Sequence, residues 1–335
     1  MHPHHGISRR HVLGLTVAIG GLAMAHDVRQ LWAQAPGGSG KVSLDVRHSE
    51  LHTLITPETL LSRIAGGLGF TEGPVWRGGA LLFTDIPNKR IVRWRRLAEG
   101  PELTTYATGN GNGLTLDRNG QVLVAEHDGR RVTRVAEDGT RTVLAERFQG
   151  KRLNSPNDLV VRSDGSVYFT DPPFGLPKFF DDPRKELPYS GVYRWHSGRL
   201  TLLTAELKGP NGLAFTPDEK FFYVDNWDPD RKVVLRFPVR ADGTLGPSTV
   251  FADMTAELPG EEALDGMKVD VAGNLYVSAP DGVRIYAPDG THLGTIRGPK
   301  VAHNFAWGGE DGRTLYLTAR SGLYRIPLLI PGVRP

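Results

Sequence analysis

The sequence predicts an all-β protein, a six-bladed β-propeller that follows an N-terminal export signal. One pattern recurs six times: an acidic or amide residue, a short apolar run, a tight turn and a second apolar run. The repeats are roughly 40 to 55 residues apart, the period expected when each repeat folds into one small sheet around a common axis. The residues that open the repeats, called anchors below, are Glu72, Asn112, Asn157, Asn211, Asp265 and Asn304.

Residues 1–35 resemble a twin-arginine export signal. Residues 8–13 contain the arginine pair, and the uncharged stretch 12–25 is too short to span a bilayer as a helix. Cleavage is expected after Ala25 or Ala35. We therefore expect export by the twin-arginine translocation machinery, a periplasmic or secreted mature protein, and no stable membrane insertion once the signal is removed. The alternative is a disordered basic tail.

A linker and the propeller domain are expected to follow the signal. Residues 36–40 are rich in glycine and serine, so a flexible linker is expected over residues 36–52. The propeller domain is expected over residues 53–335. Residues 53–65 are apolar enough to supply a strand to the last blade beside residues 322–328, and this strand would close the ring.

The clearest strand pairs lie in the second to fifth repeats. Their apolar runs are short, β-branched or aromatic and bounded by turns, so strands are expected rather than helices. The turns contain Gly120, Gly165 and Gly273, whereas the fourth repeat has Glu219 at the corresponding position. The expected strands are 114–116 with 122–124, 159–161 with 167–169, 213–215 with 221–224, and 267–269 with 275–277.

Four of the anchors are candidate metal ligands. Corresponding positions of successive blades form a ring around the axis, so the anchors should meet at one mouth of the central channel. Glu72, Asn157, Asn211 and Asp265 offer only oxygen, which suits one hard divalent cation. Ca²⁺ is preferred, Mg²⁺ and Mn²⁺ are alternatives, and Zn²⁺ is less favoured without His or Cys. The other interpretation is that these residues only form turns.

The segments around the anchors resemble the senescence marker protein (regucalcin) and gluconolactonase family. The similar motifs are residues 71–76, 154–158, 209–215 and 265–270, in the family's order, and the resemblance covers about residues 55–330. It implies a six-bladed propeller in which the four ligands above hold a single divalent cation. It also implies hydrolysis of a small-molecule lactone, with gluconolactone as the usual substrate, although relatives hydrolyse other lactones or organophosphates.

Asp265 is the candidate catalytic residue. A cation bound to the lactone carbonyl oxygen stabilises the negative charge that develops as the carbon becomes tetrahedral, and it acidifies a neighbouring water. Asp265 is then the general base. Because contact with a cation lowers the pKa of a carboxylate and weakens it as a base, a metal-bound hydroxide is the alternative. A nucleophilic role for Asp265 is a further alternative.

Four other residues are candidates for substrate binding. Arg152 is expected to bind a hydroxyl or carboxylate, unless it is a surface arginine. Asn112 and Asn154 are candidates for hydrogen bonds to sugar hydroxyls, although Asn112, like Asn304, alternatively forms only a turn. His303 directly precedes the sixth anchor and is a candidate for lining the pocket; the alternative is a structural histidine.

The third repeat differs from the others in carrying an insertion. Residues 171–190 contain several prolines, which disfavour regular strand pairing, and several aromatic residues, which indicate packing rather than disorder. The insertion is expected either to roof the pocket or to form a surface loop. Asp158, which directly follows an anchor, is expected to brace its own loop.

Composition excludes several classes of function. The chain has 40 Lys and Arg against 37 Asp and Glu, and residues 1–35 account for most of the difference, so no nucleic-acid surface is expected. The absence of cysteine excludes disulfides and thiolate sites, and there is no Gly-x-Ser-x-Gly motif of the serine hydrolases. Two alternatives to a lactonase stay open: a non-catalytic binding propeller, and a phosphotriesterase that uses the same metal site.

Overall fold

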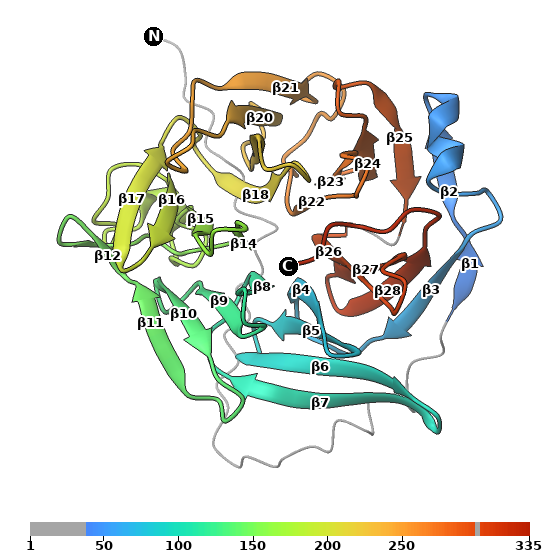
Figure 1. Cartoon of the computed structure of the whole chain (residues 1–335), viewed down its shortest axis with the longest axis horizontal. Coiled ribbons are helices and arrows are strands. Elements are labelled where there is room, and N and C mark those ends of the chain that lie inside the picture. Colours follow the sequence, from blue (N-terminus) through green and yellow to red (C-terminus); the bar gives the residue numbers. More distant parts are fainter. Residues whose placement is uncertain (1–37, 299–301) are drawn as a thin grey trace, which may run out of the picture.

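Six antiparallel sheets surround a common axis in the computed structural model, which describes residues 38–298 and 302–335 (Figure 1). The expected all-β six-bladed propeller is confirmed. In blades 1 to 4 the strands pair in chain order from the axis outward, and blades 5 and 6 do the same but add strands from the N-terminal segment at their outer edges. A two-stranded ribbon, β12 (Arg147–Phe148) and β13 (Lys151–Arg152), lies between blade 2 and blade 3 in the chain.

The blades use the strand pairs that the sequence predicts and add outer strands to them. Blade 1 is β4 (Thr71–Arg77), β5 (Ala80–Asp85), β6 (Arg90–Leu97) and β7 (Gly100–Thr108); blade 2 is β8 (Leu114–Leu116), β9 (Val122–Glu126), β10 (Arg131–Val135) and β11 (Arg141–Ala145). Blade 3 is β14 (Leu159–Val161), β15 (Val167–Asp171), β16 (Gly191–His196) and β17 (Arg199–Thr204); blade 4 is β18 (Pro210–Phe215), β19 (Phe221–Asn226), β20 (Val233–Pro238) and β21 (Thr249–Asp253). Blade 5 contains β22 (Met267–Val269), β23 (Leu275–Ala279), β24 (Gly282–Tyr286) and β25 (His292–Arg297), and blade 6 contains β26 (Asn304–Gly308), β27 (Thr314–Ala319) and β28 (Gly322–Pro327).

The innermost strands of the blades contact one another around the axis. They are β4, β8, β14, β18, β22 and β26. Because each lies between two neighbouring blades, these strands are buried at most positions, and β8 is buried at every one. Each anchor lies at or just before the start of its innermost strand, so the anchors surround the same mouth of the channel.

The turns at the opposite mouth have the backbone geometry that the sequence indicates. Gly120, Gly165 and Gly273 have φ angles of 74°, 81° and 91°, in the left-handed region that favours glycine. Glu219 takes the same conformation with a φ of 55°. Its carboxylate accepts hydrogen bonds from the backbone N–H and the hydroxyl of Ser163 in blade 3, which offsets the cost of this conformation for a residue with a side chain.

Blade 6 is built from both ends of the described chain. As expected, residues 53–65 supply the closing strand: β3 (Leu60–Ala65) pairs with β28, with Leu323 opposite Ala65 and Arg325 opposite Ser62. A short 3₁₀ helix, η2 (Ser49–Thr53), precedes this strand. The ring is therefore closed by hydrogen bonds between strands that lie far apart in the sequence.

The structure differs from the flexible linker expected over residues 36–52. β1 (Ser39–Lys41) pairs with β3, and β2 (Ser43–Val46) pairs with β25, so this segment adds a fifth strand to blade 6 and to blade 5. Val42 between the two strands is buried, and so is Leu51 in η2. The outer edges of both blades offer unpaired backbone groups, and pairing with these edges outweighs the weak strand propensity of the segment.

The C-terminal residues lie against the channel mouth opposite the anchors. Val333 N–H donates to Val269 O, and Asp270 and Gly332 form an isolated β-bridge. Any side chain at position 332 would collide with the ring of Trp307, so only glycine fits. A cavity of about 130 Å³ between the innermost strands and these residues is lined by Trp76, Phe215 and Pro335, among others. Figure 1 shows the C-terminus near the centre of the ring.

The twin-arginine-type signal expected over residues 1–35 lies outside the described residues. Within the described ranges, no helix is long and apolar enough to cross a membrane.

Candidate metal centre

A glycine follows four of the six anchors, and it allows the next blade to come close. A Cβ atom at Gly73, Gly113, Gly212 or Gly266 would lie within 3.0 Å of the anchor residue of the following blade. The backbone N–H of Gly113 donates to Asn157 O at 2.8 Å, and that of Gly266 donates to His303 O at 2.8 Å. The anchor-glycine pairs therefore let neighbouring anchors approach across the blade boundaries.

Hydroxyl groups on the second strands fix the backbone of the anchors. Thr84 of β5 donates to Glu72 O in its own blade and lies 2.9 Å from Asn112 O in the next blade. Thr170 of β15 similarly donates to Asn211 O of blade 4 at 2.8 Å. In blades 1 and 4 the strand register is also irregular at the anchor, and such bulges change the direction of a side chain.

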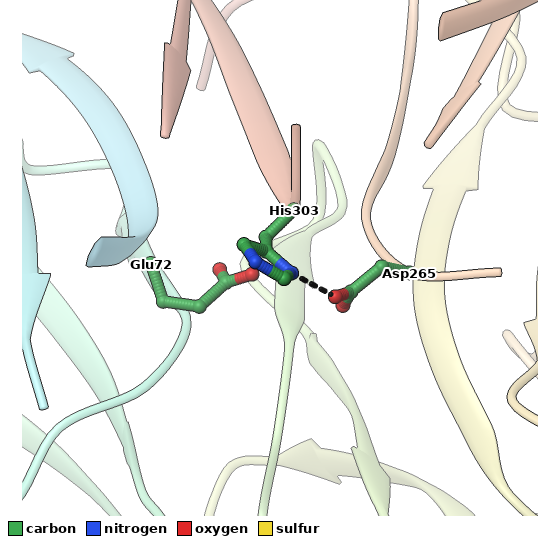
Figure 2. Close-up of side chains that lie close together, drawn as sticks. All are labelled: Glu72, Asp265 and His303. Atoms are coloured by element: carbon green, nitrogen blue, oxygen red, sulfur yellow. Dashed lines mark hydrogen bonds and ion pairs between the residues drawn. The ribbon is translucent and has the colours of Figure 1, made fainter. Parts of the chain in front are cut away.

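Glu72, Asp265 and His303 form the tightest cluster at this mouth. One potential ligand atom from each lies within 4.8 Å of the others, although the three residues come from blades 1, 5 and 6 (Figure 2). Glu72 and His303 are buried, and Asp265 is partly exposed. The arrangement brings two carboxylates and an imidazole together at the end of the channel.

His303 contacts Asp265 directly. A hydrogen bond of 3.0 Å joins its Nδ1 to Asp265 Oδ2, and its ring packs on Phe70 with the centroids 4.4 Å apart. A neutral imidazole that donates from Nδ1 has a lone pair on Nε2, and Nε2 is buried without a partner among the described residues. The sequence indicated a pocket-lining or structural histidine, and the structure brings it into the acidic cluster.

The described residues satisfy the Glu72 carboxylate only in part. Its Oε2 accepts a hydrogen bond from Gly73 N–H, but its buried Oε1 has no partner in the described part of the chain. Burial, then the nearby carboxylates of Asp265 and Asp158, raise the pKa of Glu72 well above its ordinary value. Burial and Asp265 likewise raise the pKa of Asp225, and the buried Oδ2 of Asp225 has no partner within residues 38–298 and 302–335.

The amide anchors also have free polar atoms. Asn157 and Asn211 are 7% and 3% exposed, and within the described ranges no hydrogen bond is made by either side-chain amide. The Oδ1 of Asn112 is fully buried and has no partner among the residues that the structure describes. Buried polar groups are normally satisfied, so unpaired oxygens around one channel mouth are the pattern that a bound cation would explain.

The remaining substrate-binding candidates do not join the cluster through any described contact. Arg152 lies in the β12–β13 ribbon, and its guanidinium donates to Gly129 O at 3.0 Å. The Nδ2 of Asn154 donates to Asp171 O and to Tyr189 O, so this amide ties the chain to the insertion. Its Oδ1 has no partner in the part of the chain described.

Sequence reasoning missed a second arginine near the Asn154 loop. Arg130 is 7% exposed, its Nε donates to Leu153 O and Asn154 O, and its Nη2 is buried without a partner among the residues described. Arg130 belongs to the loop between β9 and β10 in blade 2, so only the fold brings it to blade 3. Its distance in sequence from the motif left no signal to find it.

The insertion in blade 3 lies on the anchor side of the ring, because β15 runs from the opposite mouth back to this one. It packs on the Asn154 loop, where Gly175 N–H donates to Ser155 Oγ at 2.6 Å. Phe174 packs on Trp227 of blade 4 with the ring centroids 5.1 Å apart. Asp171 accepts hydrogen bonds from the N–H groups of Asn154 and Ser155, and burial raises its pKa to about 8.

The known proteins that are similar to this chain in sequence or structure include several lactonases. A model of the family described as "SMP-30/Gluconolactonase/LRE-like region" matches residues 70–321. A gluconolactonase of Zymomonas mobilis is 35% identical over 297 residues, covering 82% of this chain and 83% of that protein. A pentonolactonase of Haloferax volcanii is 29% identical over 261 residues, covering 75% and 81%. A solved gluconolactonase structure from Xanthomonas campestris matches with a TM-score of 0.77 and 31% identity, covering 88% of this chain and 97% of that one.

Proposed function

The chain belongs to the SMP-30/gluconolactonase family and is a lactonase-type hydrolase, and from this premise we propose that it opens the ring of a sugar lactone with one divalent cation. Two relatives are named for sugar lactones, a gluconolactonase and a pentonolactonase. This supports a sugar lactone over a phosphotriester, and catalysis over a purely binding propeller.

The observation that carries the proposal is the cluster of Glu72, Asp265 and His303 at the anchor mouth, in which the buried Oε1 of Glu72 has no partner among the described residues. Glu72, Asn157, Asn211 and Asp265 would hold the cation, and His303 Nε2 is a further candidate donor. The oxygen ligands favour Ca²⁺, with Mg²⁺ or Mn²⁺ as alternatives, and the imidazole makes Zn²⁺ more plausible than the anchors alone do. When bound, the cation would polarise the lactone carbonyl and offset the charge that develops on its oxygen.

Asp265 is proposed to act as the general base. Its Oδ2 accepts the hydrogen bond from His303, which fixes the orientation of the carboxylate. Asp265 would take a proton from the attacking water as the new C–O bond forms, and would return that proton to the ring oxygen as the C–O bond of the lactone breaks. The partial exposure of Asp265 allows water to reach it, whereas Glu72 is buried.

The insertion of blade 3 is proposed to form one wall of the substrate pocket. It packs on the loop that carries Asn157 and meets blade 4 through Phe174 and Trp227. Aromatic rings beside a site of polar anchors are suited to packing against the C–H face of a sugar ring, and Asn112 and Arg130 are candidate partners for the sugar hydroxyls.

We further propose that the twin-arginine translocation machinery exports the protein to the periplasm.

A pH-stat assay of metal-stripped protein tests the function. Ca²⁺, Mg²⁺, Mn²⁺ and Zn²⁺ are restored singly, and gluconolactone, an aliphatic lactone and a phosphotriester are compared against buffer without enzyme. Restored turnover of the sugar lactone is expected, together with its loss in Glu72→Gln. Glu310→Gln, the same change on an exposed turn at the opposite mouth, is the matched control. Turnover that is independent of every cation would refute the proposal.

A further inference from the structure

We propose that Lys268 is the internal counter-ion of this metal centre, and that its ammonium joins Asp158 to Asn304 across the channel and limits the site to one divalent cation. The inference rests on the proposed function, because it assigns a residue to the same centre. Lys268 would not touch the substrate. It would act as a positioning residue for the groups beneath the anchors.

Lys268 takes part in a closed set of contacts between three blades. Its Nζ donates to Asn304 Oδ1 at 3.1 Å and to Met267 O at 2.9 Å, and it lies 3.5 Å from Asp158 Oδ2. The Nδ2 of Asn304 donates to the same Asp158 oxygen at 3.1 Å. Blades 3, 5 and 6 are therefore linked by one ammonium, one amide and one carboxylate.

The glycine pattern explains why there is room for these side chains. Four anchors are followed by glycine, but Asn157 is followed by Asp158. A Cβ atom at Gly113 would collide with the Asp158 carboxylate, and one at Gly266 would collide with the Asn304 amide. Blade 3 thus places an acid at a position where most blades have no side chain, and blade 5 supplies the lysine that pairs with it.

Charge indicates what the lysine does. Four carboxylates, those of Glu72, Asp158, Asp225 and Asp265, interact electrostatically at this end of the channel. Among the described residues, Lys268 is the one lysine or arginine within ion-pair distance of any of them. When all four carboxylates are ionised, a divalent cation and Lys268 together offset three of the four negative charges, whereas the cation alone offsets two. Removing the lysine charge should therefore increase the affinity of the site for cations, because less of the carboxylate charge is neutralised by the protein itself.

Calcium titration of four proteins tests this assignment: the wild type, Lys268→Met, Asp158→Asn and the double variant. Removing the ammonium should tighten Ca²⁺ binding about tenfold or admit a second ion, and removing the Asp158 charge should weaken binding about tenfold. The double variant should return to within about threefold of the wild type, because the two charges cancel. Lys220→Met, at a 75% exposed lysine, is the control for the substitution itself.

The outcomes separate this inference from the proposed function. A wild type that binds no Ca²⁺, Mg²⁺, Mn²⁺ or Zn²⁺ overturns both. A wild type that binds one ion, with Lys268→Met and Asp158→Asn both unchanged or both weaker, overturns the role of Lys268 alone. Opposite shifts in the two single variants support it, because a loss of structure would weaken binding in both. If Lys268→Met does not fold, Lys268→Gln and Asp158→Asn provide the same comparison.

Discussion

Replacing Asp265 with Asn should abolish turnover and stabilise the metal-free protein. The amide has the shape of the carboxylate but lacks its charge, and Asp265 lies within 4.8 Å of Glu72. At that separation two unit charges repel by about 3.5 kcal/mol at an effective dielectric constant of about 20. Because Glu72 relieves part of this repulsion by binding a proton, we expect a stabilisation of a few kcal/mol at most.

The stabilisation should depend on pH in a defined direction. Burial, Asp265 and Asp158 raise the folded-state pKa of Glu72 above its unfolded value. The folded protein therefore retains a proton that the unfolded chain loses, and the metal-free protein loses stability as pH rises from the unfolded pKa of Glu72 to the raised folded pKa. Asp265→Asn lowers that folded pKa, so its stabilising effect should be small at pH 5 and larger at pH 8.

Activity provides the second readout. Loss of a general base typically costs 10² to 10⁴-fold in rate, or about 2.7 to 5.5 kcal/mol of transition-state stabilisation. We would measure urea unfolding in EDTA at both pH values and lactone hydrolysis in the pH-stat, with Asp311→Asn on an exposed turn as the control. A variant that keeps more than about a tenth of wild-type turnover would remove Asp265 as the base. A less stable metal-free variant would refute the repulsion argument.

Glu72 should also make Ca²⁺ affinity depend on pH. The affinity should rise as pH approaches the raised pKa of Glu72, because the carboxylate must lose its proton to bind the ion. Titration calorimetry should show a weaker dependence of Ca²⁺ affinity on pH in Glu72→Gln. Deleting residues 53–65 removes the strand that closes blade 6, so the melting temperature should fall by more than about 10 °C, and an unchanged value would contradict closure by this strand. Phe174→Ala should raise KM for the lactone about fivefold while Ca²⁺ affinity stays within about twofold, because the Phe174 ring packs on Trp227 and not on an anchor. Weakened Ca²⁺ binding would show that the insertion supports the metal site instead.

Local signals in the sequence predicted much of the fold. The turn glycines and the apolar runs beside them are local features, so the inner strand pairs fall where the sequence indicates, and even Glu219 adopts the left-handed conformation of the glycine it replaces. β1 and β2 were not predictable in this way. Their sequences are weak strand formers, and they are strands because two blade edges, formed by residues far away in the sequence, accept them.

The sequence predicted those residues of the candidate site that occupy the repeated anchor positions. It did not predict the residues that lie outside the repeat pattern. The anchor positions identify one mouth of the channel, and the position of His303 beside an anchor gave a weak signal for its location. Its contact with Asp265 needed the geometry of blades 5 and 6. Lys268 and Arg130 gave no such signal, because their neighbours lie in other blades. Arg152 is adjacent to the motif in sequence, yet its guanidinium bonds to Gly129.

The shared construction of blade 6 has a consequence for biosynthesis. β3 leaves the ribosome early, whereas its partner β28 is among the last segments to be translated. A nascent chain that ends before residue 322 therefore has no partner for β3 and cannot complete the ring, whatever the state of the other blades. Stalled chains of increasing length should stay protease-sensitive until β28 has emerged. If the protein is exported already folded, as proposed above, this order would restrict transport to full-length molecules and leave truncated ones behind.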